Sequence, residues 1–144
     1  MSTDILQRTS RIRRYWYVWL SIVACAVILR FTVFFGVASD QRFGLAIIYM
    51  LVTWLPIMVL NLIEGRRLMH YLETRHYRKW EELTYVPGFG SGGHNGFRSL
   101  PWLYSADDLG DPIVASLKAE QRRFIRFVLT VFFSYLVVLP LLSI

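Results

Sequence analysis

The chain has 144 residues, of which 55% are hydrophobic and 18% are charged, and its formal net charge is +6. Its single cysteine, Cys25, excludes an internal disulfide and is expected to be a small buried apolar residue. The positive charge does not indicate nucleic-acid binding. Residues 64–123 contain nine Lys or Arg against eight Asp or Glu, which leaves no basic patch to neutralise phosphates along a groove.

Three apolar segments of membrane-spanning length dominate the sequence, at residues 15–37, 44–63 and 124–144. A helix rises about 1.5 Å per residue, so each segment can cross a hydrocarbon core of roughly 30 Å. Backbone groups cannot stay unpaired in lipid, which predicts helices. The expected fold class is therefore all-α, a polytopic membrane protein whose first span is a retained signal anchor. The expected domains are a basic N-terminus (1–14), a transmembrane hairpin (15–63), a helix–loop–helix (64–123) and a third transmembrane helix (124–144).

The distribution of positive charge predicts the orientation in the membrane. Thirteen Lys or Arg fall in residues 1–14 and 64–123, against one Arg in the connection at residues 38–43. Because Lys and Arg stay on the cytoplasmic side, the N-terminus and residues 64–123 are expected inside and the C-terminus outside. The arginines expected to contact anionic lipid headgroups are Arg11, Arg13, Arg14, Arg66, Arg67, Arg122 and Arg123.

Two features inside the spans are unusual. Arg30 is expected well within the first span, where a charge is costly and faces a partner or water. It could snorkel toward the outer headgroups or Asp40, pair with another subunit, or belong to a substrate or proton pathway. Pro56 cannot donate to the carbonyl of Val52, which predicts a bend in the second span, and Thr53 is placed to satisfy the freed carbonyl.

After the second span, the helical pattern is predicted to continue to about Leu83. Five of the nine glycines then fall within residues 85–96, which must be a loop because glycine at that density favours neither helix nor strand. Trp80, Trp102 and Tyr104 are aromatic anchors of the kind enriched at protein interfaces. Together with Arg30, these three are the predicted partner-binding residues.

The pair Asp111 and Pro112 is a strong helix start, with Asp at the N-cap and Pro at the first helical position. One helix is predicted to run from there through the third span. Asp107 and Asp108 could join Asp111 in attracting a cation. Asp108 and Asp111 are at least as well explained as turn and cap residues.

Enzyme and cofactor signatures are weak. His70, Glu73 and His76 are spaced by three, which spreads them over about 120° of helix surface, whereas metal-binding histidines favour one face. They are expected to form a solvated face. The glycine-rich loop at residues 85–96 lacks the preceding strand and the following Lys of a phosphate-binding loop. We expect no catalytic residue, no cofactor and no metal.

A looser pattern covers residues 64–144: a basic helix after a span, a Gly/Asn loop, a Trp/Tyr-rich segment and an Arg-containing helix that leads into the last span. The residues that carry it are Arg66, Arg67, Leu72, His76, Tyr77, Trp80, Leu83, Gly92, Gly93, His94, Asn95, Pro101, Trp102, Leu103, Tyr104, Leu109, Gly110, Asp111, Pro112, Gln121, Arg122 and Arg123. This pattern resembles the small bacterial inner-membrane proteins related to universal stress protein B. The resemblance implies a bacterial inner-membrane location and a non-enzymatic, stress-linked role, and it carries over no catalytic residue.

The function most consistent with these features is an accessory or assembly subunit of a larger membrane complex. Three spans with almost no outer domain bury little against one another, so their apolar faces would seek partner helices. The expected partners are other integral membrane subunits and anionic lipids, with no nucleic acid and no identified small-molecule substrate. The alternatives are a stand-alone stress-linked membrane protein and, less favoured because polar residues in the spans are few, a small transporter component.

Overall fold

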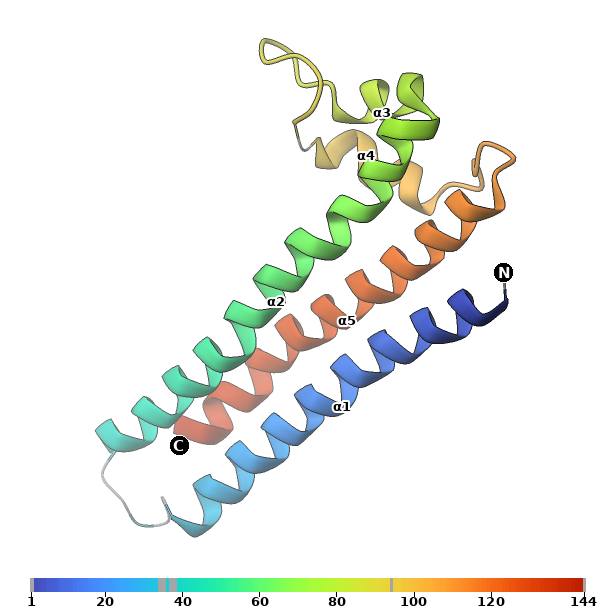
Figure 1. The fold of residues 1–144 in the computed structure, drawn as a ribbon. Coiled ribbons are helices and arrows are strands. Elements are labelled where there is room, and N and C mark those ends of the chain that lie inside the picture. The colour runs from blue at the N-terminus through green and yellow to red at the C-terminus, as the bar shows by residue number, and fades with distance from the viewer. Residues whose placement is uncertain (1, 34–35, 37–38, 94, 144) are drawn as a thin grey trace. The chain divides into compact units, whose positions relative to one another are not determined.

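The computed structural model describes residues 2–33, 36, 39–93 and 95–143, and the side chains of residues 2–10 and 39–42 lie outside the description. The described residues form five helices, shown in Figure 1: α1 (Ser2–Thr32), α2 (Ser39–Arg75), α3 (Tyr77–Thr84), α4 (Gly96–Tyr104) and α5 (Pro112–Ser143). Within these residues the β-structure is limited to an isolated bridge between Val86 and Gly90. The prediction of an all-helical fold is confirmed.

Three of the helices contain segments long and apolar enough to cross a membrane. These segments are Arg11–Thr32, Phe43–Arg75 and Pro112–Ser143. Their length and composition are those of membrane-spanning helices, as the sequence predicts. The basic residues Arg11, Arg13 and Arg14 are part of α1 and not of a separate tail, since that helix begins at Ser2.

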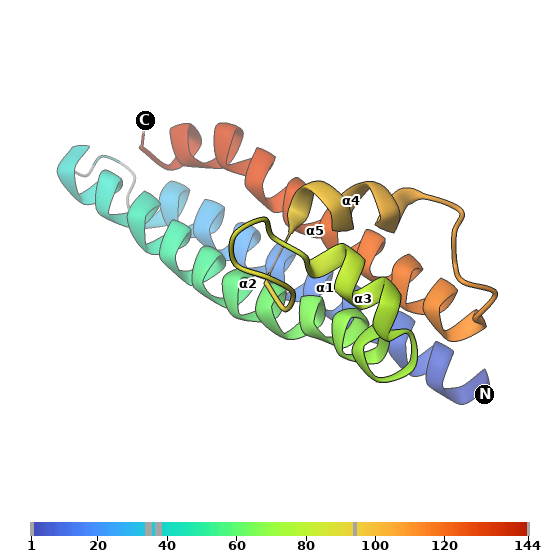
Figure 2. The ribbon, with the colours of Figure 1, turned by 90° about the horizontal axis from the view of Figure 1, so that it is seen from above.

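The chain divides into two compact units. The bundle unit comprises Met1–Asn61 and Ile125–Ile144, and the α3–α4 unit comprises Leu62–Phe124. In the bundle unit, α1, the first part of α2 and the last part of α5 lie side by side, with α2 antiparallel to the other two (Figures 1 and 2).

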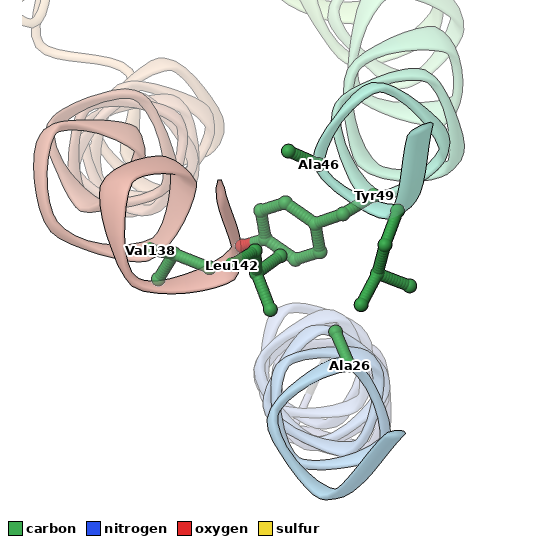
Figure 3. Close-up of a cluster of buried hydrophobic side chains, with 6 residues drawn as sticks. Ala26, Ala46, Tyr49, Val138 and Leu142 are labelled. Carbon is green, nitrogen blue, oxygen red and sulfur yellow. The ribbon is translucent and has the colours of Figure 1, made fainter. Parts of the chain in front are cut away.

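All three helices contribute to the core of the bundle unit. Its buried residues are Ala26 from α1, Leu45, Ala46 and Tyr49 from α2, and Val138 and Leu142 from α5. The Tyr49 ring occupies the space between the helices, while Ala26 and Ala46 present only a methyl group (Figure 3). Small residues let helices approach closely, which is the main source of helix association in lipid. Cys25, next to Ala26, is exposed in the structure and not buried as predicted, because its side chain faces away from this core.

The connection between the first two spans lies earlier in the chain than predicted. The helix α1 ends at Thr32 and α2 begins at Ser39, so the predicted connection at residues 38–43 is wrong. Gly36 has φ +79°, a left-handed conformation that glycine adopts without a steric penalty. Residues 33–37 are apolar enough to extend a hydropathy-based span, but hydropathy does not detect such a change in backbone conformation.

The predicted role of Thr53 beside Pro56 is also wrong. The helix α2 passes through Pro56 without ending. Thr53 Oγ1 lies 2.7 Å from the Tyr49 carbonyl oxygen and 2.8 Å from the Tyr135 hydroxyl. A threonine hydroxyl in a helix reaches the carbonyl four residues back, so Thr53 bonds to Tyr49 and not to Val52. Its second contact links α2 to α5.

The α3–α4 unit departs from the predicted helix–loop–helix in two ways. The expected continuous helix to Leu83 is interrupted at His76, which has φ −134° and ψ 53°. A helix that the sequence did not predict, α4, begins after Asn95, whose side chain accepts a hydrogen bond from the Arg98 amide. The apolar residues buried in this unit are Leu68, Leu72, Leu83, Trp102, Leu103, Val114, Leu117 and Phe124.

Candidate functional site

The carboxylate of Asp111 makes several contacts within the α3–α4 unit. Its Oδ1 accepts the Ile113 amide at 2.8 Å, which caps α5 as the sequence predicts. Its Oδ2 accepts the Tyr71 hydroxyl at 2.8 Å and lies 3.0 Å from His76 Nε2. These hydrogen bonds, with that of His76 the largest influence, lower the pKa of Asp111 to about 2. The carboxylate is therefore a fixed anion at neutral pH and is unsuited to act as a base.

His76 occupies the break between α2 and α3. Its amide donates to the Leu72 carbonyl at 2.7 Å, and its carbonyl accepts the Trp80 amide at 3.0 Å, so its backbone closes one helix and opens the next. Its side chain makes no cap bond and reaches Asp111 instead. The break thus brings the imidazole to the start of α5. The predicted solvated face does hold for His70, which is 77% exposed and lies 3.6 Å from Glu73.

A second cluster is centred on Lys118, whose side chain the sequence analysis did not single out. Lys118 is 2% exposed, and its Nζ donates to the Ser105 carbonyl at 3.1 Å and the Asp107 carbonyl at 2.8 Å. The ammonium also lies 4.2 Å from the centroid of the Trp102 ring, a cation–π contact. Because the nitrogen is buried and occupied by acceptors, it is not available as a nucleophile. Its role in this arrangement is to hold the segment that joins α4 to α5.

Asp107 links this cluster to α3. Its Oδ2 accepts the Trp102 indole N–H at 3.1 Å and lies 3.5 Å from Lys79 Nζ. Partial burial acts to raise the pKa of Asp107, but the hydrogen bonds from Trp102 and the Leu109 amide, together with the Lys79 charge, outweigh it and lower the pKa.

The segment from Asp107 to Asp111 has a strained backbone. Leu109 has φ 59° and Gly110 has φ 66°, and the left-handed region is unfavourable for leucine. Carboxylates hold both amides, since Asp107 Oδ1 accepts from Leu109 at 3.3 Å and Asp108 Oδ1 accepts from Gly110 at 3.2 Å. Asp108 is thus a turn residue, as the sequence suggests.

The aromatic residues predicted to bind a partner differ in how exposed they are. Trp102 is 6% exposed and belongs to the core, so the expectation of a surface anchor there is wrong. Its ring packs inside the unit, where its N–H donates a hydrogen bond to Asp107. Trp80 is half-buried, with its ring 5.3 Å from that of Tyr77. Tyr104 is 51% exposed and is open to contact.

Arg30 lies in the last turn of α1, because this helix ends at Thr32. Its charge is therefore close to the negative end of the helix dipole. The side chain is 8% exposed, and its guanidinium carbon lies 5.6 Å from the centroid of the Phe31 ring. The predicted contact of Arg30 with another subunit stays a prediction. The Asp40 side chain lies outside the described residues, so the predicted pairing with it is not described.

Most of the arginines predicted to contact lipid headgroups are exposed. The exposed ones are Arg11, Arg13, Arg14, Arg66 and Arg123. Arg67 and Arg122 are half-buried, and Arg67 Nη1 lies 3.1 Å from Glu64 Oε2.

The α3–α4 unit contains a small cavity. A cavity of about 10 Å³ is lined by Glu64, Arg67, Leu68, Leu117, Glu120, Gln121 and Phe124. This is room for about one water molecule. Across the residues that the structure describes, no three His, Cys, Asp or Glu side chains gather where they could hold a metal ion.

Sequence reasoning overlooked Lys118, although a signal was present. Val114, Leu117, Gln121 and Phe124 recur at helical spacing on one face of α5, and Lys118 falls on the same face. A lysine on an apolar stripe must find acceptors when the stripe is buried. The contacts that His76 and Tyr71 make with Asp111 had no comparable signal, because they join residues 35 and 40 positions apart.

Taken together, these contacts suit a structural junction: two charged side chains, Asp111 and Lys118, join the segment before α5 to α2, to the start of α3 and to the end of α4. No protein-family model matches the chain, and neither the curated proteins nor the solved structures give a significant match. The resemblance to proteins related to universal stress protein B therefore stays a prediction.

Proposed function

We propose that this protein is a non-enzymatic accessory or assembly subunit of a larger membrane protein complex. The observation that carries the proposal is how little of α1 is buried by the rest of the chain. In the apolar part of α1, 11% of the residues are buried within the chain, against 28% in α2 and 22% in α5. The helix α1 therefore has the largest free surface for a helix of another subunit.

The free surface of α1 includes exposed apolar side chains that lie on one side of the helix. Val18, Cys25 and Leu29 recur at intervals of seven and four residues, which places them on one side of the helix, and all three are exposed. These side chains are apolar and include the small Cys25, while Ile22, which lies between Val18 and Cys25, packs partly against the bundle core. Such a surface suits close packing against another transmembrane helix, in which van der Waals contact is the main attraction.

The proposal includes a location and an orientation. The exposed arginines Arg11, Arg13 and Arg14 precede the apolar part of α1 and support a cytoplasmic N-terminus that contacts anionic lipids. With three spans, the C-terminus is then periplasmic. A bacterial inner membrane follows from the resemblance in residues 64–144.

Site-specific photo-crosslinking in native membranes tests this proposal. We expect a photoreactive residue at position 18 or 29 to form adducts with another integral membrane protein. The matched control is position 26, where the side chain is buried in the bundle core and should react within the chain. If positions 18 and 29 yield only lipid adducts, the stand-alone stress-linked alternative becomes the better description.

A further inference from the structure

One part of the α3–α4 unit differs sharply from its surroundings in charge. Residues 85–105 contain no Asp or Glu and a single Arg, Arg98, whereas residues 64–84 contain nine charged residues and residues 106–123 contain seven. This segment comprises the glycine-rich loop and α4. An absence of carboxylates over such a length is compatible with contact to an anionic surface.

The same segment exposes large apolar side chains, to which we refer as the apolar set: Phe89, Phe97, Leu100 and Tyr104. Phe89 is 91% exposed and Phe97 is 96% exposed. Phe97, Leu100 and Tyr104 recur on one face of α4, opposite the face that buries Trp102. The helix α4 is thus apolar on both faces, and only one of them is covered by the chain.

The backbone that carries Phe89 is well ordered by hydrogen bonds. The Val86 amide donates to the Gly90 carbonyl at 2.8 Å, and the Phe89 and Gly90 amides both donate to the Val86 carbonyl at 3.0 Å. Gly88 has φ +85°, which completes a tight turn. Residues 86–90 of the glycine-rich loop therefore form a hydrogen-bonded turn that holds Phe89 away from the protein.

We propose that the apolar set inserts into the boundary between headgroups and acyl chains of the bilayer that the long helices cross. Aromatic rings favour this layer, and Arg98 matches the charge of anionic headgroups. Residues 62–124 are joined at both ends to membrane-spanning helices, so the set is held close to a bilayer and needs little affinity of its own.

A lipid surface fits these observations better than a protein partner does. Protein interfaces surround an apolar centre with a polar rim, but Arg98 is the single charged side chain in residues 85–105. Tyr104, which the sequence suggested as a partner contact, contacts lipid in this arrangement. The inference does not depend on the proposed role as an accessory subunit.

Fluorescence quenching in reconstituted vesicles tests the insertion. The full chain, with Cys25→Ser and Ser91→Cys, would carry a bimane label at position 91, which is exposed beside Phe89. The vesicles contain phosphatidylcholine and phosphatidylglycerol. We expect lipid-attached nitroxides to quench this label several-fold more than aqueous iodide does. A matched label at position 81, exposed on α3, should show the reverse order.

Substitution of the apolar set provides the second measurement. Phe89→Ala combined with Phe97→Ala should reduce the lipid quenching at position 91 to the level of position 81. Tyr77→Ala, which removes an exposed aromatic side chain from α3, should leave it unchanged. Equal iodide quenching at positions 91 and 81 would overturn the proposal. Shielding at position 91 that occurs in native membranes but not in pure lipid vesicles would also overturn it, because a protein would then cover the set.

Discussion

The bundle unit and the α3–α4 unit are stabilised in different ways. The bundle unit packs apolar side chains around Ala26, Ala46 and Tyr49, and its contact between α2 and α5 through Thr53 is a single pair of hydroxyl groups. The α3–α4 unit depends on two charged groups, Asp111 and Lys118, each with several partners.

The difference fits the topology predicted from the sequence, in which the bundle unit lies in lipid and the α3–α4 unit in water. In lipid, burying a leucine gains little, since acyl chains are as apolar as the protein interior, so packing and helix continuity must maintain the structure. In water, each buried leucine contributes about 2 kcal/mol, but apolar contacts alone do not fix the path of short helices and turns. Charged groups with several hydrogen bonds supply that specificity. Substitutions should therefore affect the two units unequally.

The largest effect is expected for Lys118→Met. The substitution keeps the side-chain volume but leaves the Ser105 and Asp107 carbonyls without their donor, at a cost of about 3 kcal/mol. Amide exchange in residues 105–111 should become roughly 100-fold faster, while the bundle unit stays protected. Arg123→Met, an exposed change on the same helix, is the control. Equal protection in both variants would show that Lys118 does not hold this segment.

Lowering the pH should destabilise the α3–α4 unit but not the bundle unit, with a smaller effect than that of Lys118→Met. Asp111 has a pKa of about 2, below its ordinary value of 3.8, and the pKa of Asp107 is also lowered. A carboxylate with a lowered pKa stabilises the fold above its ordinary pKa, and this contribution is lost as the pH falls through the lowered value. The α3–α4 unit should therefore loosen between about pH 4 and pH 2.

Fluorine NMR of fluorotryptophan can follow this change in both units at once. Resonances of Trp80 and Trp102 report on the α3–α4 unit, and those of Trp16, Trp19 and Trp54 report on the bundle unit. We expect only the first two to shift between pH 4 and pH 2, and Asp111→Asn to weaken the shift. A simultaneous change of all five would contradict the assignment of acid sensitivity to the α3–α4 unit.

The smallest effect is expected for Thr53→Val in the bundle unit. It removes the hydroxyl contact to Tyr135, which in a membrane is worth about 0.6 kcal/mol. A detergent unfolding titration of Thr53→Val, Tyr135→Phe and the double variant would measure the coupling between the two residues. A coupling as large as the effect of Lys118→Met would remove the contrast between the units.

The sequence predicted features that depend on local composition. The three spanning helices follow from apolar length, and the start of α5 follows from Asp111 and Pro112, whose roles depend on the next few residues. The end of α1 was placed five residues too late, since the φ of Gly36 leaves no trace in hydropathy.

Features that depend on distant residues were not predicted. The break at His76 is accompanied by a contact to Asp111, 35 positions away, and the burial of Trp102 depends on Lys118 and Asp107. The helix α4 contains Pro101 and begins at a glycine, so its local sequence favours a loop, and packing on its Trp102 face overrides that preference.

The left-handed conformation of Leu109 has a consequence for protein engineering. A leucine in that region costs about 1 kcal/mol relative to glycine, and asparagine also tolerates it. Position 109 is therefore the place at which a more stable version of this protein could be sought with a single substitution. Because Leu109 is half-buried, the loss of its apolar contacts would offset part of the stability gained by relieving the backbone strain. Comparing the stabilities of Leu109→Asn and Leu109→Gly with that of the unchanged protein would show how large the two effects are.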